Sequence, residues 1–538
     1  MSIFFKNKKH FVSSLFILTL LLSLVLSTSA KKASALQIDV PLDQAIVYSG
    51  GESTNLRTYD PATTYGSGNK LVFSGLVSFD PHLNLTPDIA ESWEVSDDGM
   101  VYIFHLRENA KFHNQRAVTA ADVVYSWERA ASPQLASDTV LTYLGDIVGV
   151  REMVAGQADH ISGLQAIDDL TLQITIDAPK PYFLLKLTFP TAFVVDKENV
   201  ETGEEWVRTP NGTGPYRLTE WRSKEYIIYE ANQEFYLGPP SIPYVVIKLY
   251  AGSDLRLFET GDVDVAGVSL YDVDRMLDPA EPLHSQLVSG VDLCTGYVVF
   301  DNTKPPFDDV NVRKAFSMAF DRQRYIDVVL RGQSLPAIGP YPPGLPGFSY
   351  ELKGLPYDPE QARELLKQSK YGGPQGLPPI VYTNGGIGSY VSADVAAMAE
   401  MWEQNLGVTL KIENIESNFY YDQIYSGNHG QIFSGGWCAD YPDPENFADV
   451  LFHSGSSQNN GGYSNPALDA LLEQARVERD VTKRIAMYQQ AEQMIVDDAP
   501  VLFTTHSLSY QLVQPYVKGF VFTPISVSLE RYMWLDGK

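Results

Sequence analysis

The sequence predicts an α/β protein built from about three lobes. With 538 residues the chain is too long for one hydrophobic core, because a domain usually takes roughly 100 to 200 residues. Hydrophobic residues make up 44% and aromatic residues 12% of the chain, as in globular rather than disordered proteins. Between residues 380 and 412 a strand, a helix and a second strand follow one another, and such a β-α-β unit indicates a sheet that is at least partly parallel.

The first 35 residues are expected to be an export signal. A basic start at 6–10 precedes an apolar run at 11–26, and 33–35 (Ala-Ser-Ala) offers a cleavage site, with 28–30 as an alternative. The run is short for a membrane-spanning helix, so an export signal is favoured over an uncleaved anchor. No cysteine follows the run, which argues against a lipoprotein. We therefore expect a periplasmic or extracellular protein.

The net charge limits the possible binding partners, and the two cysteines suggest a disulfide. The chain holds 66 acidic against 40 basic residues, a net charge of −26, which argues against nucleic acid or an anionic membrane surface as partner. Its only cysteines are Cys294 and Cys438. In an oxidising compartment these two are expected to form a disulfide, and the alternative is a pair of free, buried thiols.

Residues 38–300 are expected to be rich in strands. Runs typical of strands occupy 38–48, 100–106, 170–176, 226–230, 244–249 and 288–300. A helix is expected at 69–77 after a loop at 55–67. A capping box from Thr119 to Asp122 opens another helix, which should bury Val123, Val124, Trp127 and Ala130 or Ala131.

Residues after 305 alternate between helices and strands. Helices are expected at 312–320, from 358, through 395–402 to an end near Gly407, at 466–477 and at 481–496. Strands are expected at 380–382, 408–412, 501–503 and 510–513.

Residues 435–447 are the most distinctive part of the chain. They hold a tryptophan, a cysteine and three acids between glycines and prolines, so an irregular loop is expected in place of a helix or central strand. Its aromatic content indicates a cleft faced by Asp440 and Trp437, where a carboxylate beside an indole suits a ligand ammonium group. The alternative is a surface turn in which Asp443 and Asn446 cap the local backbone.

No motif points to catalysis or metal binding. The nine histidines show no His-Glu-x-x-His spacing, Gly-x-Ser-x-Gly is absent, and 211–216 lacks the Lys-Ser/Thr of a phosphate loop. Asp440 and Glu445 could form a glycosidase pair only if they converge in space. Asp262 and Asp264 lack the spacing of a calcium loop. We expect no enzyme, cofactor or bound metal.

Several segments resemble blocks of the family 5 extracellular solute-binding proteins of ABC importers, the group that contains the oligopeptide- and dipeptide-binding proteins. These segments are Ala90-Glu91-Ser92-Trp93, Phe104-His105-Leu106-Arg107, 110–112, 118–126, Gly212-Thr213-Gly214-Pro215-Tyr216 and 312–322. The resemblance covers essentially the whole chain after residue 35. One mild departure is Asn114-Gln115, where most members have Asp-Gly.

The resemblance implies a three-lobed periplasmic-binding-protein-like fold of type II, large cluster C, with mixed sheets and a two-strand hinge. It places domain I at 36–78, 194–293 and 506–538, domain II at 79–193 and domain III at 294–505. It also implies a monomer that captures short peptides by lobe closure and passes them to the transmembrane subunits of an ABC permease.

The resemblance also assigns ligand-binding residues. Trp437-Cys438-Ala439-Asp440-Tyr441 is similar to the oligopeptide-binding segment whose aspartate pairs with the peptide α-ammonium group. It implies a Cys294–Cys438 disulfide as well. The residues expected to bind peptide through their backbone are Ser67, Val268, Gly436 and Cys438. Tyr297 and Trp437 are expected to form apolar walls, and ordinary core packing is the alternative for both.

The sequence departs from the oligopeptide-binding pattern at two places, so ligands other than peptides are also considered. Ser434 stands where well-known oligopeptide binders carry a base, and 385–395 holds no Lys, Arg or His that could meet a ligand carboxylate. The alternatives are another solute on the same fold, such as a nickel chelate, an oligosaccharide or an opine, or else a secreted hydrolase.

Overall fold

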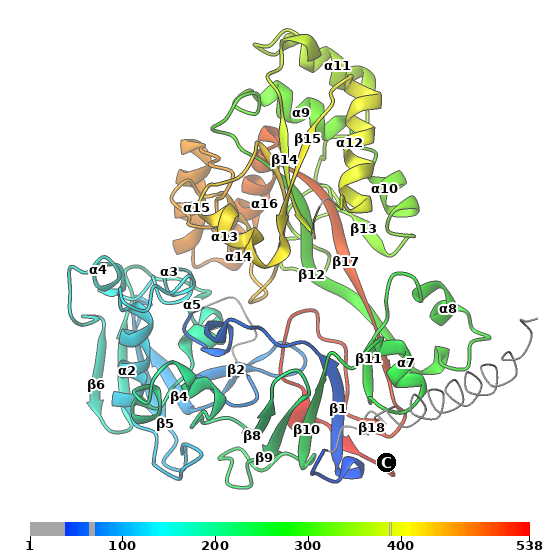
Figure 1. Cartoon of the computed structure of the whole chain (residues 1–538). Coiled ribbons are helices and arrows are strands. Elements are labelled where there is room, and N and C mark those ends of the chain that lie inside the picture. The colour runs from blue at the N-terminus through cyan, green and yellow to red at the C-terminus, as the bar shows by residue number, and fades with distance from the viewer. Residues whose placement is uncertain (1–37, 64–69, 387, 389) are drawn as a thin grey trace, which may run out of the picture. The chain divides into compact units, whose positions relative to one another are not determined.

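The computed structural model describes residues 38–63, 70–386, 388 and 390–538 (Figure 1). The expected export signal at 1–35 lies outside these residues. The chain divides into two compact units, Met1–Pro41 and Leu42–Lys538, and the description below concerns the second. Within the described ranges, no helix combines the length and apolar character that crossing a membrane requires.

The first sheet pairs a strand from the start of the second unit's sequence with strands from the middle of that sequence. β1 (Ala45–Gly50) pairs in parallel with β10 (Tyr244–Leu249), and β9 (Tyr226–Ala231) and β8 (Tyr216–Arg222) continue the sheet antiparallel. The strands expected at 226–230 and 244–249 are confirmed. The strand expected at 38–48 begins only at Ala45, because 42–44 form a 3-10 turn.

The second sheet is antiparallel and carries the predicted helix. Its order is β4 (Ala90–Val95), β5 (Val101–Leu106), β7 (Thr171–Thr175) and β6 (Leu164–Asp168). α2 (Ala120–Ala131) begins with the capping box expected at Thr119 and Asp122. Val123 and Trp127 are fully buried against this sheet, as are Ala130 and Ala131, while Val124 packs at the edge of the same core.

The third large sheet is mixed and has seven strands. Its order is β11 (Val265–Gly267), β17 (Val501–Val513), β12 (Leu287–Phe300), β16 (Ile432–Cys438), β14 (Val381–Gly386) and β15 (Lys411–Glu416), with β13 (Ser334–Pro336) paired to β17. β14 and β15 are parallel and are joined by α12 (Ala393–Leu406), so the predicted β-α-β unit is confirmed. β12 and β17 run together along most of their length (Figure 1).

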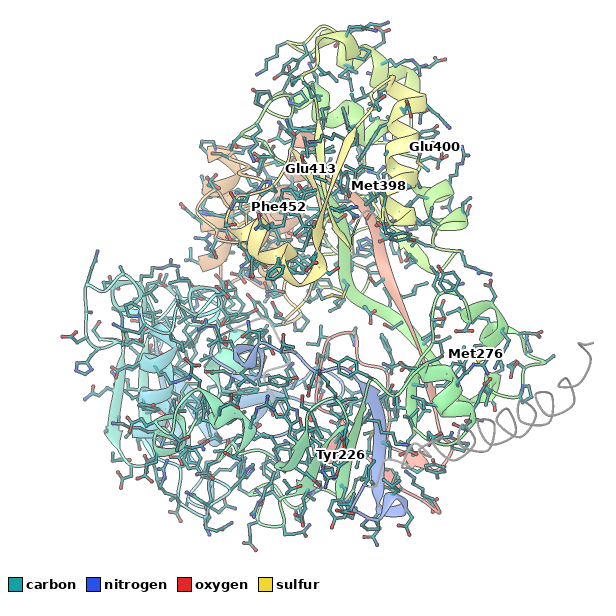
Figure 2. The ribbon with its side chains drawn as sticks, in the orientation of Figure 1. Tyr226, Met276, Met398, Glu400, Glu413 and Phe452 are labelled. Carbon is teal, nitrogen blue, oxygen red and sulfur yellow. A yellow bond between two sulfur atoms is a disulfide. The ribbon has the colours of Figure 1, made fainter. Side chains whose placement is uncertain are left out.

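Both faces of this sheet are buried. On β12, Val298 and Val299 belong to different apolar clusters, as do Ile432 and Phe433 on β16, because successive side chains point to opposite faces. Met398 of α12 belongs to one cluster and Phe452 of α14 to the other (Figure 2). A sheet covered on both faces holds its strands in fixed register.

The remaining strands and helices lie outside these three sheets. The other strands are β2 (Val77–Phe79), β3 (Leu85–Pro87), β18 (Val517–Lys518) and β19 (Trp534–Leu535). The other helices are α3 (Val140–Tyr143), α4 (Val150–Val154), α5 (Phe183–Lys186), α6 (Lys197–Val200), α7 (Asp254–Glu259), α8 (Val273–Leu277), α9 (Val310–Met318), α10 (Arg322–Val328), α11 (Pro359–Gln368), α13 (Tyr420–Tyr425), α14 (Glu445–Phe452), α15 (Pro466–Val477) and α16 (Val481–Asp498). The helices expected at 312–320, from 358, at 466–477 and at 481–496 are confirmed.

The prediction of a helix at 69–77 is wrong. Residues 70–76 form turns and extended backbone before β2, and their carbonyl groups accept hydrogen bonds from distant segments instead of from the next helical turn. The carbonyl oxygen of Val72 accepts from Gly214, and that of Ser74 accepts from Val194. Tertiary pairing therefore overrides the apolar spacing on which the helix was predicted.

Three smaller expectations also needed correction. The loop expected at 55–67 contains a 3-10 turn at Leu56–Tyr59, and its last residues, including Ser67, are outside the described part of the chain. The strand expected at 408–412 begins only at Lys411. The two closing strands are one continuous strand, β17, which spans the whole side of β12.

Candidate functional site

The segment expected to be an irregular loop begins as a strand. β16 extends to Cys438 through both glycines and pairs antiparallel with β12, so this part of the prediction is wrong. A Cβ on Gly435 would lie 2.6 Å from the ring of Tyr297. Glycine is needed there because the aromatic ring of the neighbouring strand lies directly over the backbone. The irregular segment is confined to 439–444, before α14.

Cys294 and Cys438 form the expected disulfide. They occupy opposite positions in the ladder between β12 and β16, with their Cα atoms 3.9 Å apart. The alternative of two free thiols is therefore wrong. Because Cys438 is the last residue of β16, the bond fixes the point from which the backbone leads to Asp440.

Asp440 is held by residues from two distant parts of the chain. Its carboxylate oxygen Oδ2 accepts a 2.6 Å hydrogen bond from the hydroxyl group of Tyr143 and a 3.4 Å bond from Nδ2 of Asn446. The Oδ1 atom of Asn446, which is fully buried, accepts from the Asp440 backbone N–H at 2.9 Å and from Nε1 of Trp437 at 3.2 Å. One amide of α14 thus fixes both residues that the sequence predicted to face a ligand.

The pKa of Asp440 shows that no neighbouring group fully compensates its negative charge. Burial raises the pKa of its carboxyl to about 6, although the hydrogen bonds from Tyr143 and Asn446 and the charge of Lys70 act in the opposite direction. Lys70 donates to the carbonyl oxygen of Ser526 at 2.6 Å, and burial lowers its own pKa to about 8. Lys70 acts on Asp440 through space and does not bring its pKa back to the ordinary range. A positively charged group placed beside the carboxylate would stabilise its charged form.

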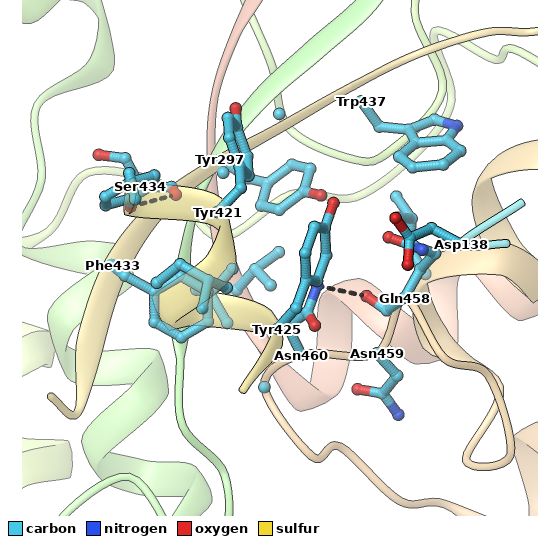
Figure 3. Close-up of a pocket in the computed structure, with 18 of the residues that line it drawn as sticks. Asp138, Tyr297, Tyr421, Tyr425, Phe433, Ser434, Trp437, Gln458, Asn459 and Asn460 are labelled. Carbon is cyan, nitrogen blue, oxygen red and sulfur yellow. Dashed lines mark hydrogen bonds between the residues drawn. The ribbon is translucent and has the colours of Figure 1, made fainter. Parts of the chain in front are cut away.

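Asp440 borders a cavity of about 610 Å³. Figure 3 shows this cavity with Tyr297 and Trp437 among the side chains that line it. The cavity is lined by five of the predicted site residues, Tyr297, Gly436, Trp437, Cys438 and Asp440. Further aromatic side chains from α13, β16 and the segments near 452 and 463 line it as well: Tyr420, Tyr421, Tyr425, Phe433, Phe452 and Tyr463. The wall thus combines aromatic side chains with polar and charged ones, and such a combination can bury a ligand and fix its orientation.

A second cavity of about 720 Å³ also borders Asp440. Lys70 lines this second cavity together with both cysteines of the disulfide. Asp440 therefore lies where two hollow regions of the molecule approach the same carboxylate. An extended ligand with its positive end at Asp440 has space available on either side.

Of the other two predicted site residues, one does not join this group and one lies outside the described residues. The backbone N–H of Val268 donates to the carbonyl oxygen of Tyr510 at 2.9 Å, and Val268 lines neither of the two cavities. Its neighbour Gly267 does line the second cavity. Ser67 falls outside the described residues. A role for either in ligand binding remains a prediction.

The cavity contains one basic residue that the sequence did not single out. Arg57 lines it, and its Nη1 and Nη2 atoms donate to the carbonyl oxygens of Leu135 and Ala136, both at 2.9 Å. Ser434 also lines the cavity, within hydrogen-bond distance of the Tyr382 hydroxyl group at 2.7 Å. Arg57 comes from the segment read only as a loop, and its two bonds to carbonyls hold the guanidinium in place.

Glu445 lies away from Asp440 in a buried charge network. Its Oε1 is 3.2 Å from Nζ of Lys186, which is 2.9 Å from Oδ2 of Asp146, while Lys180 reaches the other oxygen of Asp146 at 2.6 Å. Glu445 lines neither of the cavities at Asp440. A glycosidase pair requires two carboxylates that face the same cavity, and of these two only Asp440 lines either cavity.

The other acidic cluster is also internally paired. Oδ2 of Asp264 accepts from the backbone N–H of Val47 at 2.6 Å and lies 2.5 Å from Nζ of Lys538, while Asp262 pairs with Lys248 at 3.2 Å. Among the described residues, no group of three or more His, Cys, Asp or Glu side chains is arranged to hold a metal ion.

Comparison with known proteins places this site in context. The model of the bacterial extracellular solute-binding proteins, family 5 middle, matches residues 84–459. The periplasmic oligopeptide-binding protein OppA of Escherichia coli is 30% identical over 532 residues, covering 93% of this chain and 95% of that protein. The probable deoxycholate-binding periplasmic protein YgiS of the same organism is 32% identical over 465 residues, covering 84% and 85%.

A solved structure extends the similarity to the fold. The crystal structure of Haemophilus influenzae OppA in complex with the peptide RPPGFSPFR is 26% identical to this chain and has a TM-score of 0.79. The match covers 93% of this chain and all of that one. The predicted periplasmic-binding-protein-like fold with mixed sheets is confirmed.

Proposed function

This chain belongs to the bacterial extracellular solute-binding proteins of family 5, and from that premise we propose that it captures short peptides and delivers them to an ABC-type permease. The family and its relatives act outside the cytoplasm, which agrees with an export signal at 1–35. We propose further that the protein works as a monomer and has no catalytic activity of its own.

The observation that carries the proposal is the Asp440 carboxylate. It is partly buried, fixed by Tyr143 and Asn446, and lies between two cavities. A carboxylate in such a place is costly unless a positive group arrives to pair with it. The α-ammonium group of a peptide supplies that charge together with three N–H donors. Asp440 would therefore set the position of the first residue of the ligand.

An uncovered strand edge supports an extended peptide beside Asp440. Among the described residues, β14 pairs with β16 only through Ile432 and Phe433, so the edge of β16 from Gly435 to Cys438 faces the cavity without a partner strand. A peptide lying there can hydrogen-bond as an added strand. Backbone bonding ignores side-chain identity, so many sequences would be accepted, with water filling the remaining gaps.

Closure of the lobes is the second part of the mechanism. With domain I at 36–78, 194–293 and 506–538, domain II at 79–193 and domain III at 294–505, the groups around Asp440 come from all three. On these bounds Tyr143 would belong to domain II, Lys70 to domain I and Asn446 to domain III, and all three act on Asp440. β12 and β17 would form the hinge. The carboxylate would then be enclosed where the three domains meet, so its pairing with a ligand would favour the closed state.

A different solute on the same fold is the second candidate. The relative named for deoxycholate binding favours it, as does the aromatic lining of the cavity at Asp440. A nickel chelate, an oligosaccharide and an opine belong to the same class of alternative. A secreted hydrolase is the third.

Mass spectrometry of the native protein decides among these candidates. The protein is purified without denaturation, its bound molecules are released with acid, and the extract is sequenced by tandem fragmentation. Peptides with free amino ends are the expected result. A sterol, sugar or chelate in their place would overturn peptide capture, and turnover of a peptide or glycoside panel by the purified protein would establish the hydrolase.

A further inference from the structure

Two acidic side chains lie in the cavity at Asp440 without a partner. Asp138, labelled in Figure 3, precedes α3, and Asp422 is on α13; both line the cavity. Within the described ranges, neither carboxylate accepts a hydrogen bond or forms an ion pair. Burial raises the pKa of Asp138, and so does the charge of Asp422, while Arg57 lowers it. The two carboxylates are thus close enough to repel each other.

Gln458 provides an independent sign that a polar ligand group belongs here. It lines the same cavity and is only 9% exposed. Its side-chain amide has no hydrogen-bond partner among the residues that the structure describes. Gln458 is not among the described side chains whose unpaired polar atoms are fully enclosed, so its amide opens into the cavity and is available to pair with a polar group of a ligand.

Aromatic rings complete the surroundings. Tyr421 and Tyr425 stand one helical turn apart on α13, with ring centroids 6.1 Å apart in a stacked arrangement. They remain 62% and 49% exposed although they line the cavity. The face of a tyrosine ring attracts a cation, and two such rings beside two carboxylates form a strongly cation-attracting surface.

We propose that Asp138, Asp422 and Gln458 bind the ammonium or guanidinium group of a basic ligand side chain, so that the protein prefers short peptides containing Lys or Arg. The proposal rests on the proposed function and narrows it to a substrate class. Asp440 takes the amino end of the peptide, and this acidic subsite takes a second positive charge.

The charge balance of the cavity supports this preference. Among the residues that the structure describes, three acids line it, Asp138, Asp422 and Asp440, against one base, Arg57, two of whose nitrogen atoms already donate to backbone carbonyls. A peptide without charged side chains brings one positive and one negative end. A basic side chain adds the positive charge that the cavity lacks, whereas an acidic one adds repulsion.

Calorimetry with matched tetrapeptides tests the proposal. Tetra-alanine is compared with peptides that carry Lys, norleucine or Glu at each later position in turn; norleucine keeps the aliphatic stem without the charge. At one position Lys is expected to bind about tenfold more tightly than norleucine, and Glu more weakly than both. Added salt should reduce the preference, because both carboxylates reach solvent.

Substitutions assign the preference to these residues. In Asp138→Asn/Asp422→Asn the Lys and norleucine peptides should bind within about twofold of each other. Asp159→Asn changes the net charge on an exposed surface that does not line the cavity and should keep the preference. Equal binding of the Lys and norleucine peptides to the native protein overturns the subsite while peptide capture stands. Failure of every tetrapeptide to bind contradicts the proposed function itself. The salt series on the native protein decides the matter even if the double variant does not fold.

Discussion

The hydroxyl group of Tyr143 donates a 2.6 Å hydrogen bond to the carboxylate of Asp440, which is 297 residues away in the sequence. Tyr143 is fully buried, and its ring stacks on Phe189 with 3.7 Å between the ring centroids. A phenol held this rigidly fixes the direction of the carboxylate before a ligand arrives. Such preorganisation lowers the entropy cost of binding.

Tyr143→Phe removes the hydroxyl group and keeps the stacked ring. The pKa of Asp440 should then rise above about 6, because a donor to the charged form is lost. At neutral pH the affinity for free-amine peptides should fall about three- to tenfold, because a larger fraction of the carboxyl is protonated and its direction is no longer fixed. Calorimetry measures the affinity, and Tyr350→Phe, at an 89% exposed tyrosine, is the matched control. Unchanged binding would show that Tyr143 does not support the site.

The affinity for free-amine peptides should depend on pH on both sides of neutrality. Ligand binding requires the charged carboxylate, so as the pH falls through about 6 a proton competes at Asp440 and the affinity drops, by about tenfold per unit well below this value. Above about pH 8 the peptide amine loses its proton and the affinity drops again. Calorimetry across this range with N-acetylated peptides as the control should reveal no acid limb for the blocked ligand. An acid limb shared by both ligands would contradict the assignment to Asp440.

Lys186 should be more important for stability than Glu445. Lys186→Met leaves the buried carboxylate of Glu445 without its cation and removes one of the two cations at Asp146, at a cost of about 3 to 5 kcal/mol in the free energy of unfolding. Glu445→Gln keeps the pairs at Asp146, and it removes a carboxyl whose pKa burial already raises to about 7, so it should cost less. Urea denaturation compares the two. Lys197→Met, at a surface pair of 3.8 Å, should cost no more than about 1 kcal/mol. Equal losses in all three variants would exclude a structural role for the network.

Glu492 should make the protein less stable as the pH rises. It is 2% exposed, and its Oε1 accepts one long bond of 3.4 Å from the backbone N–H of Tyr341, so burial raises its pKa to about 8. The folded state therefore binds the proton more tightly than the unfolded state, whose pKa is about 4.3. This contribution is fully present below about pH 4 and is lost as the pH rises to about 8, at about 1.4 kcal/mol per unit.

Glu492→Gln removes this dependence. The variant should be more stable than the native protein near pH 8 and should show a flatter profile of unfolding free energy between pH values of about 5 and 8. Glu400→Gln, at an exposed position of α12, is the control and should leave the profile unchanged (Figure 2). A native profile without a decline in this range would refute the buried, protonated state of Glu492.

Local sequence signals predicted much of the fold. The capping box at Thr119 and Asp122 opens a helix because its hydrogen bonds lie within three residues. The β-α-β unit through α12 was recognised because apolar spacing and the C-terminal Gly407 agree. Prediction failed where contacts between distant segments determine the structure. Gly435 of β16 is needed because the ring of Tyr297 on the neighbouring strand lies over it, and 70–76 is not helical because its carbonyls accept hydrogen bonds from distant segments.

The site was predicted only in part, because local sequence signals indicate neighbouring residues but not residues that the fold brings together. Trp437 and Asp440 lie three residues apart, so one segment indicated both of them and their chemistry. Tyr143, Asn446 and Arg57 carry no motif, and only the fold brings them to the cavity. Asp443 and Asn446 do cap the local backbone: Oδ1 of Asp443 accepts from the backbone N–H of Glu445, and Oδ1 of Asn446 from that of Asp440, both at 2.9 Å. The sequence did not indicate that Asn446 also accepts from Trp437 or that Asp443 also pairs with Arg484 at 2.6 Å.

The pairing of Asp440 with a ligand ammonium group is tested most directly by Asp440→Asn in calorimetry against one peptide in its free-amine and N-acetylated forms. The native protein should bind the free amine at least about a hundredfold more tightly than the acetylated form, and the variant should lose that difference while its unfolding temperature stays the same or rises. Equal affinity of the native protein for both forms would contradict the account.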